Sequence, residues 1–186
     1  MKMFRLFVAF TLICFALSPR AQAVSPPPDG NYPGYTTAEG DHALLSLTTG
    51  LGNTGVGWYS LYLDTTGSFN TGVGAGTLFS NNADSNTAVG AAALLLNTAG
   101  HDNTAVGTDA LVYNDGGSFN AANGAFALFS NTAGHDNTAN GYFALYANTI
   151  GNLNTATGSA ALFNNITGQF NTANGWECLA VDATRR

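Results

Sequence analysis

Residues 86–102 read NTAVGAAALLLNTAGHD, and this 17-residue pattern recurs along most of the chain. Every interval between successive copies is 17 residues except that from Asn70 to Asn86, which is 16. Such constant spacing predicts nine stacked rungs of one structure rather than nine separate domains. The marker Asn-Thr-Ala/Gly-x-Gly, with Ala for Thr in one copy, begins at Asn53, Asn70, Asn86, Asn103, Asn120, Asn137, Asn154 and Asn171, after a degenerate first copy at Thr36.

The residues before the repeat differ from it in composition. Lys2 and Arg5 precede an apolar run at 6–17 and the small-residue site Ala-Gln-Ala at 21–23. This pattern predicts a secretory signal peptide at 1–23, because the apolar run is too short to span a membrane. A proline-rich linker follows at 24–35, and the repeat occupies 36–186. We therefore expect export, to the medium or to the cell surface.

The charge of the exported chain excludes several classes of partner. Without residues 1–23, two arginines oppose eleven acidic residues, which gives a formal charge of −9. Such a surface repels nucleic acid and anionic lipid. No further apolar run in the mature chain is long enough for a transmembrane segment. Cys178 is the one cysteine left after processing, and it takes a position that is mostly Ala in other rungs, so we expect a small buried side chain.

Three columns of the repeat predict its interior, when positions are counted from the asparagine of each rung. Position 5 is always Gly, which indicates a positive φ or a close backbone approach. Position 9 is always Leu, which indicates a buried spine. Stacked amides of position 1 can hydrogen-bond from rung to rung, and Asn also tolerates left-handed turns. These structural columns include Gly57, Gly74, Gly90, Gly107, Gly124, Gly141, Gly158, Leu61, Leu78, Leu94, Leu111, Leu128, Leu145, Leu162, Asn86, Asn103, Asn120, Asn137 and Asn154.

The short period favours a parallel β-solenoid, or β-roll, of nine rungs. Glycine and asparagine interrupt each rung too often for helices of ordinary length, although residues 91–96 alone would favour a helix. We expect two or three short strands per rung and a rod of about 43 Å, at roughly 4.8 Å per rung. The one-residue deletion between Asn82 and Asp84 predicts a local bulge or a reset of the repeat in the third rung.

A second apolar column at position 10 predicts association between copies. If positions 9 and 10 share a strand, their side chains point to opposite faces. One column then fills the interior, while the other needs separate cover, because a soluble monomer rarely exposes so long an apolar stripe. The candidate oligomer face comprises Tyr62, Phe79, Phe129, Tyr146 and Phe163.

Residues capable of chemistry are few, and they do not recur. The pairs His101-Asp102 and His135-Asp136 occupy equivalent positions, but other rungs have Gly, Leu or Phe in place of the Asp. The sequence therefore predicts no catalytic, cofactor-binding or metal-binding residues, and no enzyme. The Thr column at position 2 leaves an alternative open, in which a monomeric solenoid binds ice or polysaccharide through its Thr face.

The segments Asn86–Gly100 and Asn137–Gly151 resemble the YadA-like head repeats of trimeric autotransporter adhesins, and related repeats of bacterial secreted proteins and phage tail fibres. The resemblance implies a left-handed parallel β-roll, assembled as a homotrimer, with an adhesive role at a bacterial surface. It also implies a host or matrix protein, or a glycan, as partner. Family members continue into a stalk with a membrane barrel, or into a chaperone domain. Because this chain stops at Arg186 within its ninth rung, we expect an incomplete stack.

Overall fold

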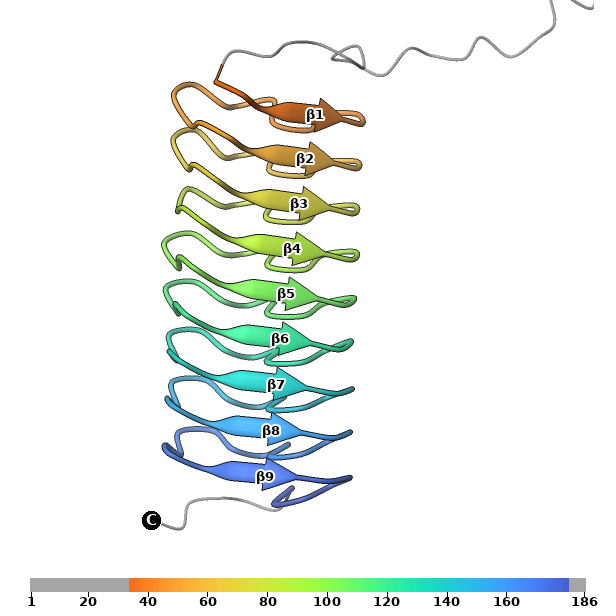
Figure 1. Cartoon of the computed structure of the whole chain (residues 1–186), viewed down its shortest axis with the longest axis vertical. Coiled ribbons are helices and arrows are strands. Elements are labelled where there is room, and N and C mark those ends of the chain that lie inside the picture. Colours follow the sequence, from red (N-terminus) through yellow and green to blue (C-terminus); the bar gives the residue numbers. More distant parts are fainter. Residues whose placement is uncertain (1–33, 181–186) are drawn as a thin grey trace, which may run out of the picture.

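A computed structural model describes residues 34–180 as one rod of stacked rungs (Figure 1). The predicted signal peptide, residues 24–33 of the linker and residues 181–186 lie outside the described residues. Nine strands form one parallel sheet in chain order, and residues 34–180 contain no helix, so the predicted all-β parallel β-solenoid is confirmed. The strands are β1 (Thr37–Glu39), β2 (Thr54–Val56), β3 (Thr71–Val73), β4 (Thr87–Val89), β5 (Thr104–Val106), β6 (Ala121–Asn123), β7 (Thr138–Asn140), β8 (Thr155–Thr157) and β9 (Thr172–Asn174).

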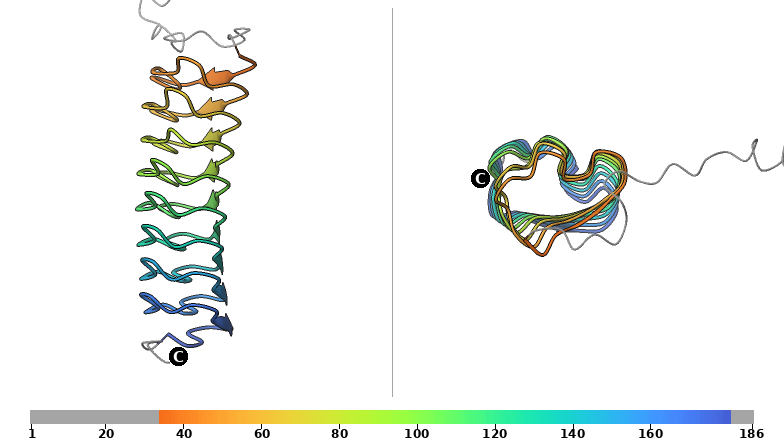
Figure 2. Two further views of the ribbon diagram at one scale, coloured as in Figure 1. Left: turned by 90° about the vertical axis from the view of Figure 1, so that its left-hand side faces the viewer. Right: turned by 90° about the horizontal axis from the view of Figure 1, so that it is seen from above.

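Each rung contains one strand, so the prediction of two or three strands per rung is wrong. Rung n is named here for its strand βn. Positions 2–4 form the strand, and the rest of the rung is a series of turns that brings the chain back beneath its start (Figures 1 and 2). Hydrogen bonds between rungs continue through these turns; for example, the Leu111 N–H donates to Ala127 O at 3.0 Å. The turns are therefore part of the stacked ladder without being strands.

Left-handed residues explain why the turns cannot extend into strands. Positions 7, 9 and 17 have positive φ in the described rungs, as in Phe126 (58°), Leu128 (51°) and Phe119 (60°). A positive φ turns the backbone away from the extended region that strands need. Positions 9 and 10 thus lie in a turn and not on one strand, which corrects the premise used to separate their side chains.

The glycine of position 5 meets both conditions that require glycine. Gly124 has φ +139°, and a Cβ added to it would lie 2.5 Å from Gly141 O in the next rung. The same clash with the following rung recurs from Gly40 to Gly158. A side chain here would strain the backbone and push two rungs apart.

The interior is narrow and filled with small and medium apolar side chains. The middle residue of each strand points inward, as Ala105 does, while its neighbours Thr104 and Val106 point outward. Leu111 and its equivalents from Leu61 to Leu162 are 0% exposed. Seen along the axis, the rungs nearly superpose around this core (Figure 2).

The deletion in the third rung leaves the sheet intact. Thr71 pairs with Thr87, and Val73 with Val89, in the same register as elsewhere. The shortened turn places Ala83 where other rungs have glycine, and its carbonyl takes over that glycine's hydrogen bonds. The bulge predicted there is absent from the sheet, because the turn absorbs the missing residue.

Candidate functional site

A buried amide spine runs along the rod beside the leucines. In rung 5, the Nδ2 groups of Asn103 and Asn114 both donate to Gly117 O at 2.8 Å. Asn114 also donates to Asn97 Oδ1 in rung 4. The same pattern extends from rung 4 through rung 7, so both lone pairs of a buried carbonyl are satisfied in each. No asparagine is among the described residues with positive φ, so the left-handed role expected for this column is not used.

Asp64 replaces asparagine at the start of this spine. Its Oδ1 accepts the Gly67 N–H at 2.8 Å, and its Oδ2 accepts Nδ2 of Asn70 and of Asn81 at 3.3 and 3.2 Å. Leu47 takes the equivalent position in rung 1 and has no oxygen to accept a hydrogen bond from an amide N–H. The carboxylate of Asp64, which accepts hydrogen bonds and donates none, therefore suits this end of the spine better than an asparagine would. Burial raises the pKa of Asp64, and the hydrogen bonds offset that effect only in part.

The candidate oligomer residues form two stacks on the outside of the rod. Phe129, Tyr146 and Phe163 have ring centroids 5.0 Å apart and interplanar angles of 12° and 8°. Tyr62 and Phe79 form a shorter stack, with centroids 5.3 Å apart. All five side chains are half-buried. The structure thus brings them to one side of the rod, in two groups separated by rungs 4 and 5.

A second aromatic column, at position 7, supports the first. Tyr59 packs on Tyr62 at 4.6 Å, and Phe143 packs on Tyr146 at 5.0 Å between centroids. The sequence analysis did not single out the aromatics of positions 6 and 7, and it missed this pairing. The spacing of three residues between the rings was the available signal. Together with exposed side chains at positions 6 and 11, these columns make a surface that we call the aromatic face: positions 6, 7, 10 and 11 of rungs 1–8, with positions 6, 7 and 10 of rung 9.

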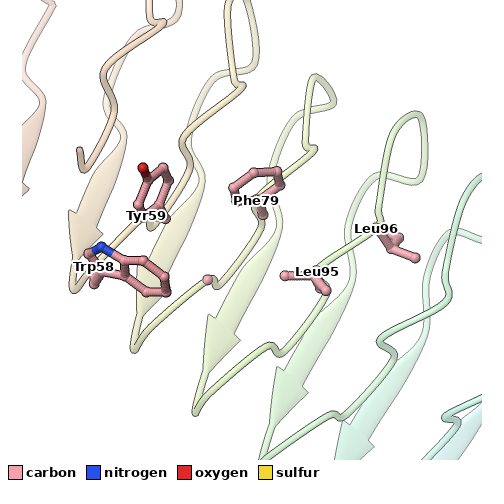
Figure 3. A pocket seen from close by; sticks show the side chains of 6 residues that line it. Trp58, Tyr59, Phe79, Leu95 and Leu96 are labelled. Atoms are coloured by element: carbon pink, nitrogen blue, oxygen red, sulfur yellow. The ribbon is translucent and has the colours of Figure 1, made fainter. Parts of the chain in front are cut away.

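An apolar groove opens where the position 7 column lacks rings. Gly76 stands where Tyr59 and Phe126 have rings, and it leaves a groove of about 480 Å³ across rungs 2–4. Figure 3 shows Trp58 and Tyr59 on one side, Phe79 in the middle and two leucines beyond it. The sequence analysis did not anticipate this groove. Its lining residues are Trp58, Tyr59, Gly76, Phe79, Leu95 and Leu96.

His101 and His135 lie on another side of the rod from the aromatic face and do not converge. His101 Nδ1 is 2.8 Å from Asp102 Oδ2, and His135 Nδ1 accepts the Ser118 N–H at 3.0 Å one rung away. Both histidines are exposed. Among residues 34–180, no three His, Cys, Asp or Glu side chains gather as metal ligands would. Cys178 is half-buried and packs against the apolar core.

The outer face of the sheet presents two columns of side chains, from the first and third positions of the strands. Thr stands at the first position of every strand except β6, which has Ala121. The third position is Val in β2–β5 and mostly Asn in β6–β9. The parallel register keeps each column straight from rung to rung. This face is regular along one column and changes character halfway along the other.

No protein family, curated protein or solved structure matches this chain. Within residues 34–180, no helix is long and apolar enough to cross a membrane. The function must therefore be inferred from the surfaces of the rod. Of these, the aromatic face combines exposed rings, a groove and little charge.

Proposed function

We propose that this chain is an exported, non-enzymatic structural or adhesive rod that associates with further copies through its aromatic face. The observation that carries the proposal is the pair of aromatic columns, which stay partly exposed along most of the rod. Trp58 is 59% exposed and Tyr142 is 51% exposed, beside half-buried rings at position 10. Apolar patches of this length on soluble proteins usually mark an interface.

The distribution of charge on the rod supports the same proposal. Only Asp41, Asp109 and Glu177 carry a formal charge among the described residues of the aromatic face. Interface centres are depleted in charged residues and enriched in Tyr, Trp and Phe. Among the other described acids, Asp64 is buried, and the rest lie on other sides of the rod, where copies of so acidic a chain would repel each other. Association is therefore favoured through this face over the others.

The orientation of the rings favours a protein partner over a sugar. Phe129, Tyr146 and Phe163 stack face to face along the rod. Their ring planes are covered by one another, so mainly their edges reach the surface. A sugar ring stacks on a free aromatic plane, and the planes between neighbouring rings of this stack are already occupied. Edges and aliphatic neighbours instead suit packing against another apolar protein surface.

The test is the oligomeric state of the mature chain, residues 24–186, by light scattering and sedimentation. We expect a stable oligomer at micromolar concentration. Tyr146→Ser should dissociate it, because the change removes the central ring of the longer stack. Phe170→Ser is the matched control, since Phe170 is 75% exposed but belongs to position 17, off the aromatic face. A wild-type chain that stays monomeric at these concentrations refutes the proposal.

The Thr face supports a second candidate, binding of ice or polysaccharide by the monomer. The supporting observation is the straight, outward-facing Thr column of the sheet, in continuous register from β1 to β5. Thermal hysteresis or glycan binding by a monomer, lost after Thr71→Val and Thr104→Val together, would favour this candidate. The same double change should leave association through the aromatic face unaltered.

A further inference from the structure

We propose that two copies pair antiparallel through the aromatic face, so that rung n of one copy packs on rung 10 − n of the other. This inference rests on the proposed association through that face and specifies its partner and register. The evidence is a match of large and small side chains between rungs on either side of rung 5.

The first match is between rungs 3 and 7. Rung 3 has Ala75 and Gly76 at positions 6 and 7, and there the groove of about 480 Å³ opens. Rung 7 has Tyr142 and Phe143 at the same positions, and Tyr142 is 51% exposed. The groove and the protruding rings lie two rungs from rung 5 in opposite directions. A two-fold axis through rung 5 therefore places each ring pair over the other copy's groove.

The second match is between rungs 2 and 8, with the sizes reversed. Rung 2 presents Trp58 and Tyr59, whereas rung 8 presents Ser159 and Ala160. The same axis places the exposed Trp58 ring over these two small residues. At positions 6 and 7, large side chains thus meet small ones in both pairs of rungs, which is how interdigitating surfaces exclude voids. At position 10 the same register sets ring against ring, Phe79 with Tyr146 and Tyr62 with Phe163.

Rungs 4 and 6 are compatible with the same register, whereas rung 5 places like charges together. Rung 4 has Ala91 and Ala92 opposite Ala125 and Phe126 of rung 6. Rung 1 presents Asp41 and His42, whose side chains are 2.8 Å apart, opposite Trp176 and Glu177 of rung 9. Rung 5 meets its own copy with Thr108 and Asp109, and a parallel pair also holds the two Asp109 side chains at one level, so these acids do not distinguish the arrangements.

The size of the face requires nearly full overlap. Nine rungs at about 4.8 Å and four columns at about 5 Å cover roughly 43 Å by 15–20 Å. That is about 650–850 Å² on each copy, close to the roughly 800 Å² that each partner buries in a stable interface. A shift by several rungs would leave too small an area, so the choice is between full parallel and full antiparallel overlap.

Parallel overlap does not use the match of sizes. It keeps rung 7 beside rung 7, so that Tyr142 and Phe143 of the copies crowd the same level. It also keeps the groove of rung 3 beside another groove. The homotrimer implied by the resemblance to adhesin heads is parallel, and it is the arrangement that competes with this proposal.

Distances between spin labels on the two copies distinguish the arrangements. The labels go on the outer face of the sheet, at Val106→Cys in β5 and at Thr157→Cys in β8, each in a Cys178→Ala background. Both positions are exposed and belong to the same column. In an antiparallel pair the two β5 labels lie level, whereas the β8 labels are separated along the rod by six rungs, or about 29 Å. A parallel assembly gives equal distances for the two sites.

Two substitutions test the fit of ring and groove. Tyr142→Ala removes the protruding ring, and Ala92→Phe adds a ring that blocks the groove from its side. The added ring suits the turn, because Phe126 and Phe143 have φ 58° at the same position, against 56° for Ala92. Each change should raise the dissociation constant of the dimer by about tenfold or more, as truncation or blocking of a central anchor does. Phe170→Ala, off the face, should change it by less than about twofold.

The possible outcomes separate this inference from the proposed function. A dimer with the long β8 distance, weakened by both substitutions, supports the antiparallel pair. A dimer or trimer with equal β5 and β8 distances overturns the antiparallel pair but leaves association through the aromatic face standing. A monomeric wild-type chain overturns both. A dimer that neither Tyr142→Ala nor Ala92→Phe weakens overturns the match of ring and groove.

Discussion

Replacing glycines with alanine should test how the rungs hold together. Two glycines of position 5, Gly124 and Gly175, and a third glycine in a turn, Gly116, allow the cost of backbone strain to be measured apart from the cost of close contact between rungs. Gly124 has φ +139° and an added Cβ would lie 2.5 Å from Gly141 O. Gly175 has φ +129°, but the nearest atom to an added Cβ is Cys178 Cβ at 3.9 Å. Gly116 has no atom within 4 Å of an added Cβ and no left-handed φ. Alanine at these positions therefore imposes strain with contact, strain alone, or neither.

The expected magnitudes follow from these three environments. A non-glycine residue in this region of φ costs about 1–3 kcal/mol. Forcing a methyl group into occupied space costs about 1–3 kcal/mol more. Gly124→Ala should thus lower the free energy of unfolding by about 2–6 kcal/mol, and Gly175→Ala by about 1–3 kcal/mol. Gly116→Ala should stabilise by about 0.4–1 kcal/mol, because it restricts the unfolded chain without straining the folded one.

Urea unfolding followed by circular dichroism, at one protein concentration for all variants, measures the order of the three. Amide hydrogen exchange adds the location, since Gly124→Ala should speed exchange in rungs 6 and 7 first. If Gly124→Ala and Gly175→Ala are equally destabilising, close contact between rungs contributes nothing. If Gly124→Ala matches Gly116→Ala, the account of the glycine column is wrong.

Three further changes address the buried groups. In the unfolded chain Asp64 ionises near its ordinary pKa of 3.8, whereas burial raises its pKa in the folded chain, so the contribution of Asp64 to stability falls as the pH rises from the unfolded pKa through the folded one. Asp64→Asn should therefore flatten the fall of the urea midpoint between pH 3.5 and 7.5. An unchanged slope would contradict this account. Asn131→Ala should lower the free energy of unfolding by about 2–4 kcal/mol in the same assay, because it leaves Asn114 Oδ1 without its donor and removes one donor from Gly134 O. The control Asn123→Ala, at an exposed strand position, should lower it by under about 0.5 kcal/mol. Equal losses for the two variants would mean that the amide spine does not stabilise the rod. Cys178→Ala should leave the thermal midpoint within about 2 °C, since six rungs already have Ala at that position. A larger drop would mean that the thiol makes a specific contact.

The sequence predicted the parts of the fold in which one chemical requirement selects one residue type. Only glycine tolerates both the φ and the contact at position 5, so Gly124 and its equivalents were readable from the repeat. The stacking of Asn103 on its neighbours was readable for a similar reason, because amides donate and accept along a column. The number of strands was not readable. It depends on Leu128 and its equivalents adopting a left-handed φ, which leucine rarely does and which nothing in its side chain signals.

The aromatic face was predicted in part. Position 10 was recognised because its side chains repeat in nearly every rung. The groove was not recognised, because it arises where Gly76 carries no ring in the position 7 column. Whether the side chains of that column point outward depends on the conformation of the turn. The bulge predicted near Asn82 failed for a related reason, because a turn can lose a residue while the strands on either side keep their register.

Repetition and specificity therefore belong to different parts of the rod. The inner positions are nearly the same in every rung, so they favour stacking equally at every level and carry no information on register with a partner. Register can come only from positions where the rungs differ. Trp58 in rung 2 and Tyr142 in rung 7 are such departures, and each faces a small residue when rung n meets rung 10 − n. If the departures were neutral drift in exposed turns, large and small side chains would have no reason to match across rung 5, and Ala92→Phe would not affect association.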